Sequence, residues 1–228
     1  MRKGKCFNAF ARSLAHSVAA LEQIPNSVRL WKQTVSLEDS ANDARILLAR
    51  AVEVIPLSVE LWLALARLET PERAKAVLNK ARKAVPTSHE IWIAAGCLLE
   101  QEAASDPNLP PEERQKKIDI VDATIEGGVK ALRKHQVLLT REQWLKEAEK
   151  CETDGSVRTC EAIIKATIAM DVEEEDRLDT WTTDAESAEA RGMIGTARAI
   201  LAYTLRVFPD RRSLWKRAAD LEKAHGTR

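Results

Sequence analysis

Apolar residues recur every three or four positions along most of this chain, which is the spacing of an amphipathic α-helix. The first such stretch contains Phe10, Leu14, Val18 and Leu21 and predicts a leading helix over residues 7–24. Because the same spacing continues to the last residues, we expect an all-α fold without a sheet.

Tryptophan marks a longer period within this helical pattern. The chain has 6 Trp but only 1 Tyr and 3 Phe. Successive tryptophans are separated by 31, 30, 52, 37 and 34 residues. Distances of this size are typical of one helix–turn–helix unit copied along a chain. The six residues are Trp31, Trp62, Trp92, Trp144, Trp181 and Trp215.

Proline and small residues accompany the tryptophans. Four copies read Pro-x5-Trp, and proline ends the helix before it because it lacks an N–H group. Serines just after these prolines, such as Ser58 and Ser88, are predicted to cap the next helix. A small residue follows most tryptophans by four positions, so that a neighbouring helix can approach the indole closely. These positions are Ala66, Gly96, Ala148, Ala185 and Ala219, with Val35 as the exception.

The second helix of each unit carries small residues at fixed places. Ala-Arg or Ala-Lys follows the tryptophan by about 12–16 residues, and another small residue comes seven positions later. We interpret the tryptophans as packing residues, and expect Trp62 to be largely buried with Ala66 beneath it. The pattern predicts a right-handed superhelical solenoid of helix–turn–helix repeats, because such units bury a continuous core only by stacking.

The repeats divide the chain into one array without separate domains. After the leading helix over 1–24, the units are expected at 25–55, 56–85, 86–137, 138–171 and 172–208, with a first half-unit at 209–228. Since both ends lack a helix partner, we expect the chain to be a fragment of a longer array.

Local signals place the turns and helix ends. Pro71 is expected at a first helical position, and Thr140 with Gln143 forms a predicted capping box. Turns are expected at 39–42, 153–156 and 191–192, and an acidic run at 173–176 should begin a helix. The proline-rich segment 103–111 predicts one long loop, and Gly127-Gly128 is expected to end or break the helix predicted over 112–134.

Composition excludes several function classes. Lys and Arg total 35, as do Asp and Glu, so the formal net charge is +0 and the chain as a whole is not an electrostatic nucleic-acid binder. No run of 18 apolar residues predicts a membrane span, and no signal-peptide cleavage site follows the N-terminal residues.

Candidate chemistry is sparse. No phosphate-binding loop, nucleophile–base arrangement or metal-ligand spacing is present, so we expect no enzyme activity, no cofactor, no metal and no small-molecule substrate. Cys6, Cys97, Cys151 and Cys160 form no CxxC pair and are interpreted as buried reduced thiols. Cys151 and Cys160 would be the first ligands to suspect if a metal were found.

Several segments resemble a known family of RNA-processing repeats. Asn26 to Lys32, Ser58 to Thr70, Val77 to Arg82, Arg141 to Trp144, Glu173 to Arg177 and Glu222 to Arg228 resemble the pre-mRNA-processing factor 6 family, whose repeats are of the half-a-TPR (HAT) type. The resemblance is expected to extend from about Asn26 to the end, outside residues 1–20 and the loop at 103–111. It implies a non-catalytic nuclear scaffold that bridges spliceosomal tri-snRNP proteins.

Direct RNA contact stays open as an alternative function. Arg211, Arg212, Lys216 and Arg217 form a local basic cluster that could bind phosphates or an acidic partner. Acidic residues lie nearby and the overall charge is balanced, so protein partners in a solenoid groove are favoured over RNA.

Overall fold

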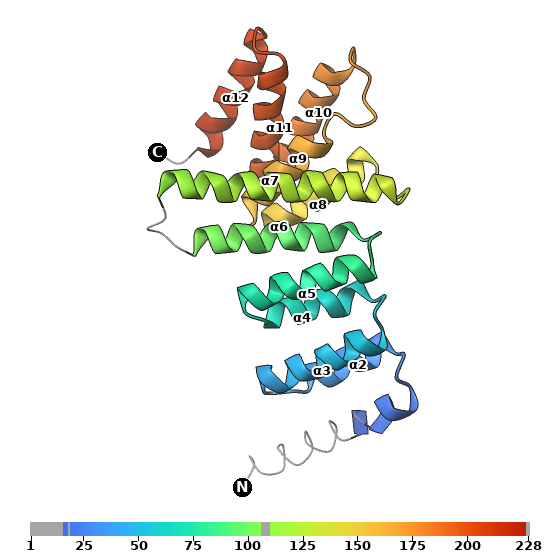
Figure 1. The fold of residues 1–228 in the computed structure, drawn as a ribbon. Coiled ribbons are helices and arrows are strands. Elements are labelled where there is room, and N and C mark those ends of the chain that lie inside the picture. Colours follow the sequence, from blue (N-terminus) through green and yellow to red (C-terminus); the bar gives the residue numbers. More distant parts are fainter. Residues whose placement is uncertain (1–15, 18, 106–109, 227–228) are drawn as a thin grey trace. The chain divides into compact units, whose positions relative to one another are not determined.

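A computed structural model describes residues 16–17, 19–105 and 110–226. Within these ranges every regular element is a helix, and eleven of them are labelled α2 to α12 (Figure 1). The predicted all-α fold of consecutively packed helices is therefore confirmed. The structure divides into two compact units, residues 1–94 and 95–228. None of the described helices has the length and apolar character needed to cross a bilayer.

The first unit contains two complete helix pairs. Helix α2 packs against α3, α3 packs against α4, and α4 packs against α5. The bounds are α2 Val28–Ser36, α3 Ala41–Val54, α4 Val59–Leu68 and α5 Pro71–Ala84. Small residues let these helices approach closely, because Ala44, Ala51, Ala74 and Ala81 are all buried.

Hydrogen bonds explain the Pro-x5-Trp spacing. The indole N–H of Trp31 donates to the carbonyl of Pro25, and that of Trp62 donates to Pro56, each at 2.8 Å. Since the polar edge of each ring is satisfied by the preceding turn, the rest of the ring can be buried without an unpaired donor. Trp31 and Trp62 are 3% and 7% exposed, and the predicted burial of Trp62 is confirmed. Ala66 is half-buried.

Helix α6, His89–Ala104, runs across the boundary between the two units, and six further helices follow it. They are α7 Pro111–Lys134, α8 Arg141–Thr153, α9 Val157–Thr167, α10 Arg177–Ala190, α11 Ile194–Val207 and α12 Arg212–His225.

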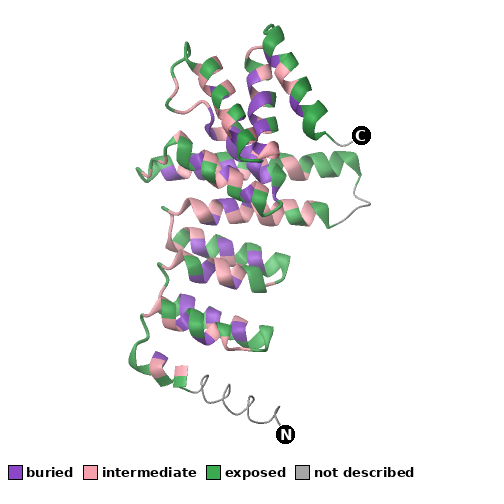
Figure 2. Ribbon diagram, turned by 180° about the vertical axis from the view of Figure 1, so that it is seen from behind, coloured by how far each residue is buried: buried purple, intermediate pink, exposed green. Residues whose placement is uncertain are grey.

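Helices α9 and α11 form the centre of the second unit. Helix α9 packs against α7, α8 and α11, and α11 also packs against α10 and α12. Both are rich in buried residues, as Figure 2 shows in purple. Ile163, Ile164 and Ile200 are at most 1% exposed. Trp181 is also 1% exposed, and its ring packs against Tyr203 of α11 and against Phe208, the C-cap residue of that helix. The core of this unit is therefore built around second helices of the predicted repeats.

Most predicted helix signals are confirmed. Pro71 begins α5, and both hydrogen bonds of the Thr140–Gln143 capping box are formed. Gly155 and Gly192 adopt φ values of +84° and +81° in the predicted turns, a conformation that glycine adopts readily. The segment 173–176 precedes α10 as expected, although Asp176 makes no side-chain cap bond. Ser58 also occupies a cap position without a side-chain hydrogen bond.

The structure corrects two of the sequence predictions, and two other predicted segments lie partly outside the described residues. Gly127 and Gly128 do not break a helix, since α7 runs through both; Gly128 is buried, and packing against α9 outweighs the low helix propensity of glycine. The turn predicted at 39–42 lies earlier, because α3 already begins at Ala41. Of the leading helix over 7–24, residues 7–15 and Val18 lie outside the described residues, as do 106–109 of the predicted loop. The limits of the individual repeats stay a prediction.

Candidate functional site

The predicted tryptophan positions do not all share one environment. Trp144 and Trp181 are buried like Trp31 and Trp62, and Trp92 is half-buried with the guanidinium of Arg82 4.4 Å above its ring. Beside them Gly96, Ala148 and Ala185 are buried and Val35 is half-buried.

Trp215 differs from the expected packing role, because its side chain is 56% exposed. Helix α12 packs on α11 through Leu214 and Leu221, which places the ring and Ala219 on an outer face. Its indole N–H still donates to the carbonyl of Pro209 at 2.8 Å.

The predicted basic cluster on α12 is split by the structure. Arg211, Arg212 and Lys216 are exposed near Trp215 on the helix surface. Arg217 instead pairs with Glu189 of α10 at 2.7 Å and lies 3.7 Å from Glu186. Its charge is therefore largely neutralised within the unit. Three of the four predicted residues remain available to a partner.

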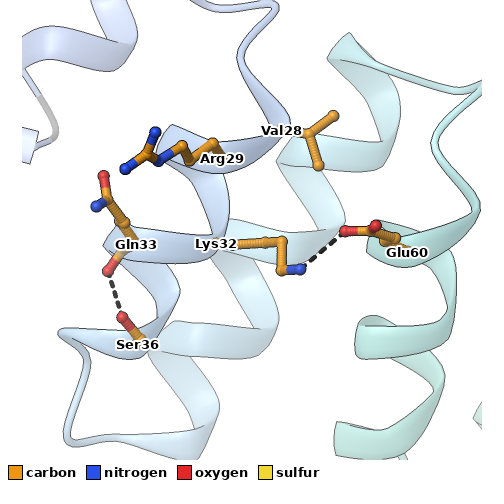
Figure 3. A pocket seen from close by; sticks show the side chains of 6 residues that line it. All are labelled: Val28, Arg29, Lys32, Gln33, Ser36 and Glu60. Carbon is orange, nitrogen blue, oxygen red and sulfur yellow. Dashed lines mark hydrogen bonds and ion pairs between the residues drawn. The ribbon is translucent and has the colours of Figure 1, made fainter.

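A hollow of about 520 Å³ lies along α2 in the first unit (Figure 3). Five α2 residues line it, and their spacing places them on one helical face. They are Val28, Arg29, Lys32, Gln33 and Ser36, and Glu60 of α4 completes the lining. We call these six residues the α2–α4 groove.

Charge in the α2–α4 groove is arranged unevenly. The Lys32 Nζ lies 2.8 Å from the Glu60 carboxylate, which joins the two helices across the hollow. Arg29 is exposed and has no ion-pair partner among the described residues. Ser36 donates to the carbonyl of Gln33 at 2.8 Å. The open shape and the unpaired guanidinium suit a polypeptide that carries an acidic side chain.

A smaller hollow of about 110 Å³ lies in the second unit. Its walls come from the end of α7, the segment 137–140 and the residues after α9, with Trp144 among them. Leu138 is 77% exposed at its edge, and Asp171 lines it with φ of 54°. An apolar hollow of this size can accept a single apolar side chain of a partner.

Two glutamates make the most organised polar contacts of the second unit. Glu100 on α6 accepts hydrogen bonds from the N–H groups of Arg158 and Thr159, and Glu152 on α8 accepts from those of Gly195 and Thr196, at 2.6–2.9 Å. Each carboxylate also accepts from the threonine hydroxyl, at 2.8 Å and 2.7 Å. A carboxylate thus satisfies the free N–H groups at the start of α9 and of α11, where it also meets the positive end of the helix dipole.

These two contacts, which we call the glutamate clasps, escaped the sequence analysis. Their signal was present: each glutamate follows a tryptophan by eight residues, and each threonine follows the next tryptophan by fifteen. A Cβ at Gly195 would lie 3.0 Å from the Glu152 side chain, so the close approach there depends on glycine. Both threonines are 0% exposed.

Among the residues that the structure describes, no group of three His, Cys, Asp or Glu side chains could hold a metal ion. Cys97, Cys151 and Cys160 are free thiols, of which the last two are buried, and Cys6 lies outside the described residues.

Comparison with known proteins confirms the predicted resemblance. No family model matches the chain. It is 51% identical over 115 residues to the pre-mRNA-splicing factor prp1 of Schizosaccharomyces pombe, which is 50% of this chain and 13% of that protein. It is also 51% identical over 100 residues to human pre-mRNA-processing factor 6, 44% of this chain and 11% of that protein. Protein STABILIZED1 of Arabidopsis thaliana is 56% identical over 110 residues, 45% of this chain and 11% of that protein.

The matched segments are thus a small part of these relatives and about half of the chain. The similarity expected from Asn26 to the last residue is accordingly found over a shorter stretch.

Proposed function

We propose that this chain is a non-catalytic protein-interaction scaffold in pre-mRNA splicing. The observation that carries the proposal is 51% identity, over about half of the chain, to proteins named as pre-mRNA splicing or processing factors. None of these names denotes a reaction. An array of helix pairs provides extended faces for polypeptides, which fits a scaffold.

The finer proposal concerns location and partners. Within a larger nuclear protein, the chain would bind proteins of the spliceosomal small nuclear ribonucleoproteins and bridge components of the tri-snRNP. The α2–α4 groove supports this proposal, since Arg29 is exposed beside Lys32 and Val28 and forms no ion pair with another described residue. An acidic helix or extended peptide would pair with Arg29 while covering the hollow.

Crosslinking mass spectrometry of the assembled particle tests the proposal directly. Crosslinks should join the region around Lys32 to other particle proteins. Arg29→Glu should weaken binding of that partner at least tenfold, because it places like charges opposite each other. Lys80→Glu is the matched control, since Lys80 is an exposed cation of α5 outside the groove. Equal loss with both variants would mean that net charge matters and the groove does not.

Direct RNA contact is the second candidate function, and Trp215 is the observation that favours it. An indole that is 56% exposed beside Arg211, Arg212 and Lys216 combines a stacking surface with cations, as single-strand binders do. A salt titration separates the two candidates, because phosphate contacts weaken steeply with salt. Submicromolar, sequence-selective RNA binding at physiological salt that Trp215→Ala abolishes would favour RNA over the protein-scaffold proposal.

A further inference from the structure

The smaller hollow of the second unit combines an apolar lining with a charged rim that the proposed function does not use. Its lining includes Val137, Leu139, Met170 and the buried Trp144. Leu138 lies at its edge and is 77% exposed, more than any other large apolar side chain of the described residues. A single exposed leucine is normal on a protein surface, but one that borders an apolar hollow indicates a surface for a partner.

The backbone fixes two walls of this hollow. Among the described non-glycine residues, φ is positive at Gln136 (59°) and at Asp171 (54°). Gln136 follows the end of α7, where the N–H of Val137 donates to the carbonyl of Leu132 at 3.0 Å, as in a Schellman motif. Asp171 lines the hollow after the end of α9. Because residues with side chains rarely adopt such φ values, the surrounding packing holds both walls in place, and a partner meets a preformed shape.

One side of the hollow is strongly acidic. Five of the six residues 171–176 are Asp or Glu, and all five are exposed. None of these carboxylates forms an ion pair with another described residue. Asp176 is the N-cap residue of α10, yet its side chain makes no cap hydrogen bond. Since Asp171 itself lines the hollow, the negative charge begins at its edge.

The acidic segment lies within reach of a short peptide seated in the hollow. A chain spans at most about 3.5 Å per residue, so the Cα atoms of Asp171 and Asp176 are no more than about 18 Å apart. On the opposite side Arg133 lines the hollow, and Lys134 and His135 follow it. The two sides therefore carry opposite charge, and the cations of a partner fit only the side of residues 171–176.

We propose that this hollow and the segment 171–176 form a docking surface for a basic polypeptide with one bulky apolar side chain. The apolar side chain would enter the hollow beside Leu138 and Trp144, and Lys or Arg residues on one side of it would pair with Asp171 and the carboxylates that follow. A nucleic acid does not fit, because its phosphates would meet charges of the same sign.

This partner differs in charge from the acidic segment proposed for the α2–α4 groove. The chain would then hold two polypeptides of opposite charge, one on each unit. Binding at the second unit depends on its own residues, so it stands or fails independently of a role in splicing.

Titration of the full chain with short peptides, followed by ¹H–¹⁵N NMR, tests the proposal. The probes are acetylated and amidated Leu-Gly-Lys-Lys-Lys and Lys-Lys-Lys-Gly-Leu, which place the cations after or before the apolar residue. One of them should shift the indole signal of Trp144 and the amide signals of 171–176. Replacing its leucine by alanine, or its lysines by glutamates, should weaken binding about tenfold or more. No shift of these signals at millimolar peptide, or equal binding of the glutamate peptide, would overturn the proposal.

Variants of the chain give a second measurement. Leu138→Ser and Asp171→Asn should each weaken binding of the better peptide about fivefold or more. Both should fold, because Leu138 is exposed and asparagine also tolerates a positive φ. Ile120→Ser and Asp220→Asn are the matched controls, since they change an exposed apolar residue and an exposed carboxylate of the second unit outside the hollow. If the controls weaken binding as much as the test variants, the hollow is not the docking surface.

Discussion

The two units hold their helices together by different chemistry. In the first unit, the described ion pairs between neighbouring repeats are Lys32 with Glu60 on the surface and Arg45 with Glu69 at 3.6 Å, where the Glu69 side chain is 11% exposed. In the second unit, the glutamate clasps join successive repeats through bonds to threonines that are fully buried. A surface pair contributes at most about 1 kcal/mol, whereas charged hydrogen bonds to buried donors contribute more and are directional.

Single positions produce this difference within one repeat pattern. The position eight residues after the tryptophan holds Glu100 and Glu152 in the second unit, but it holds Asp39 and Thr70 in the first. The position fifteen residues after the tryptophan holds the two clasp threonines in the second unit. In the first unit it holds Ile46 and Val77, neither of which has a hydroxyl. The period therefore sets where helices lie, while a few polar residues decide how tightly neighbouring repeats are joined.

The largest expected effect comes from removal of a buried tryptophan, compared with removal of an exposed one. Trp62→Ala should lower the free energy of unfolding by about 3–5 kcal/mol, because it opens a cavity in the first unit. Trp215→Ala should lower it by only about 1 kcal/mol, since an exposed ring loses little more than one hydrogen bond. Urea unfolding followed by circular dichroism measures both. Equal losses would mean that Trp215 is packed in solution.

Removal of a clasp should come next. Glu152→Ala leaves the N–H groups of Gly195 and Thr196 and a buried hydroxyl without their acceptor, which should cost about 2–3 kcal/mol in the urea measurement. Glu152→Gln is the conservative control and should cost less, because its amide oxygen can still accept. If the alanine variant unfolds at the same urea concentration as the native chain, the clasp contributes no stability.

Two glycines of the second unit test how closely its helices pack. Gly96→Ala should destabilise by about 1 kcal/mol, since the new methyl group would crowd Ile125 and Thr159 more than improved helix propensity offsets. Gly127→Ala is its control on α7, where a Cβ meets nothing within 4 Å, and should stabilise by about 0.5–1 kcal/mol. Thermal melts of the two variants should therefore shift in opposite directions.

The smallest effect is expected at the surface pair of the first unit. Lys32→Ala and Glu60→Ala in a double-mutant cycle should give a coupling energy below about 1 kcal/mol that disappears in high salt. A coupling as large as the effect of Glu152→Ala would remove the distinction between the two units.

Local chemistry was readable from the sequence. Pro71, the Thr140–Gln143 capping box, and glycines 155 and 192 act on the backbone within a few residues, so their effects do not depend on distant contacts. The tryptophan period likewise identified the helix pairs, because each repeat carries its own core positions.

Tertiary packing decided the rest. Helix α7 continues through Gly127-Gly128 because burial against α9 outweighs propensity, and Arg217 is withdrawn from the basic cluster by glutamates of α10. The glutamate clasps join residues more than forty positions apart. Such contacts depend on which helices become neighbours. The matching residue spacings in the sequence can therefore be interpreted only once the arrangement of the helices is known.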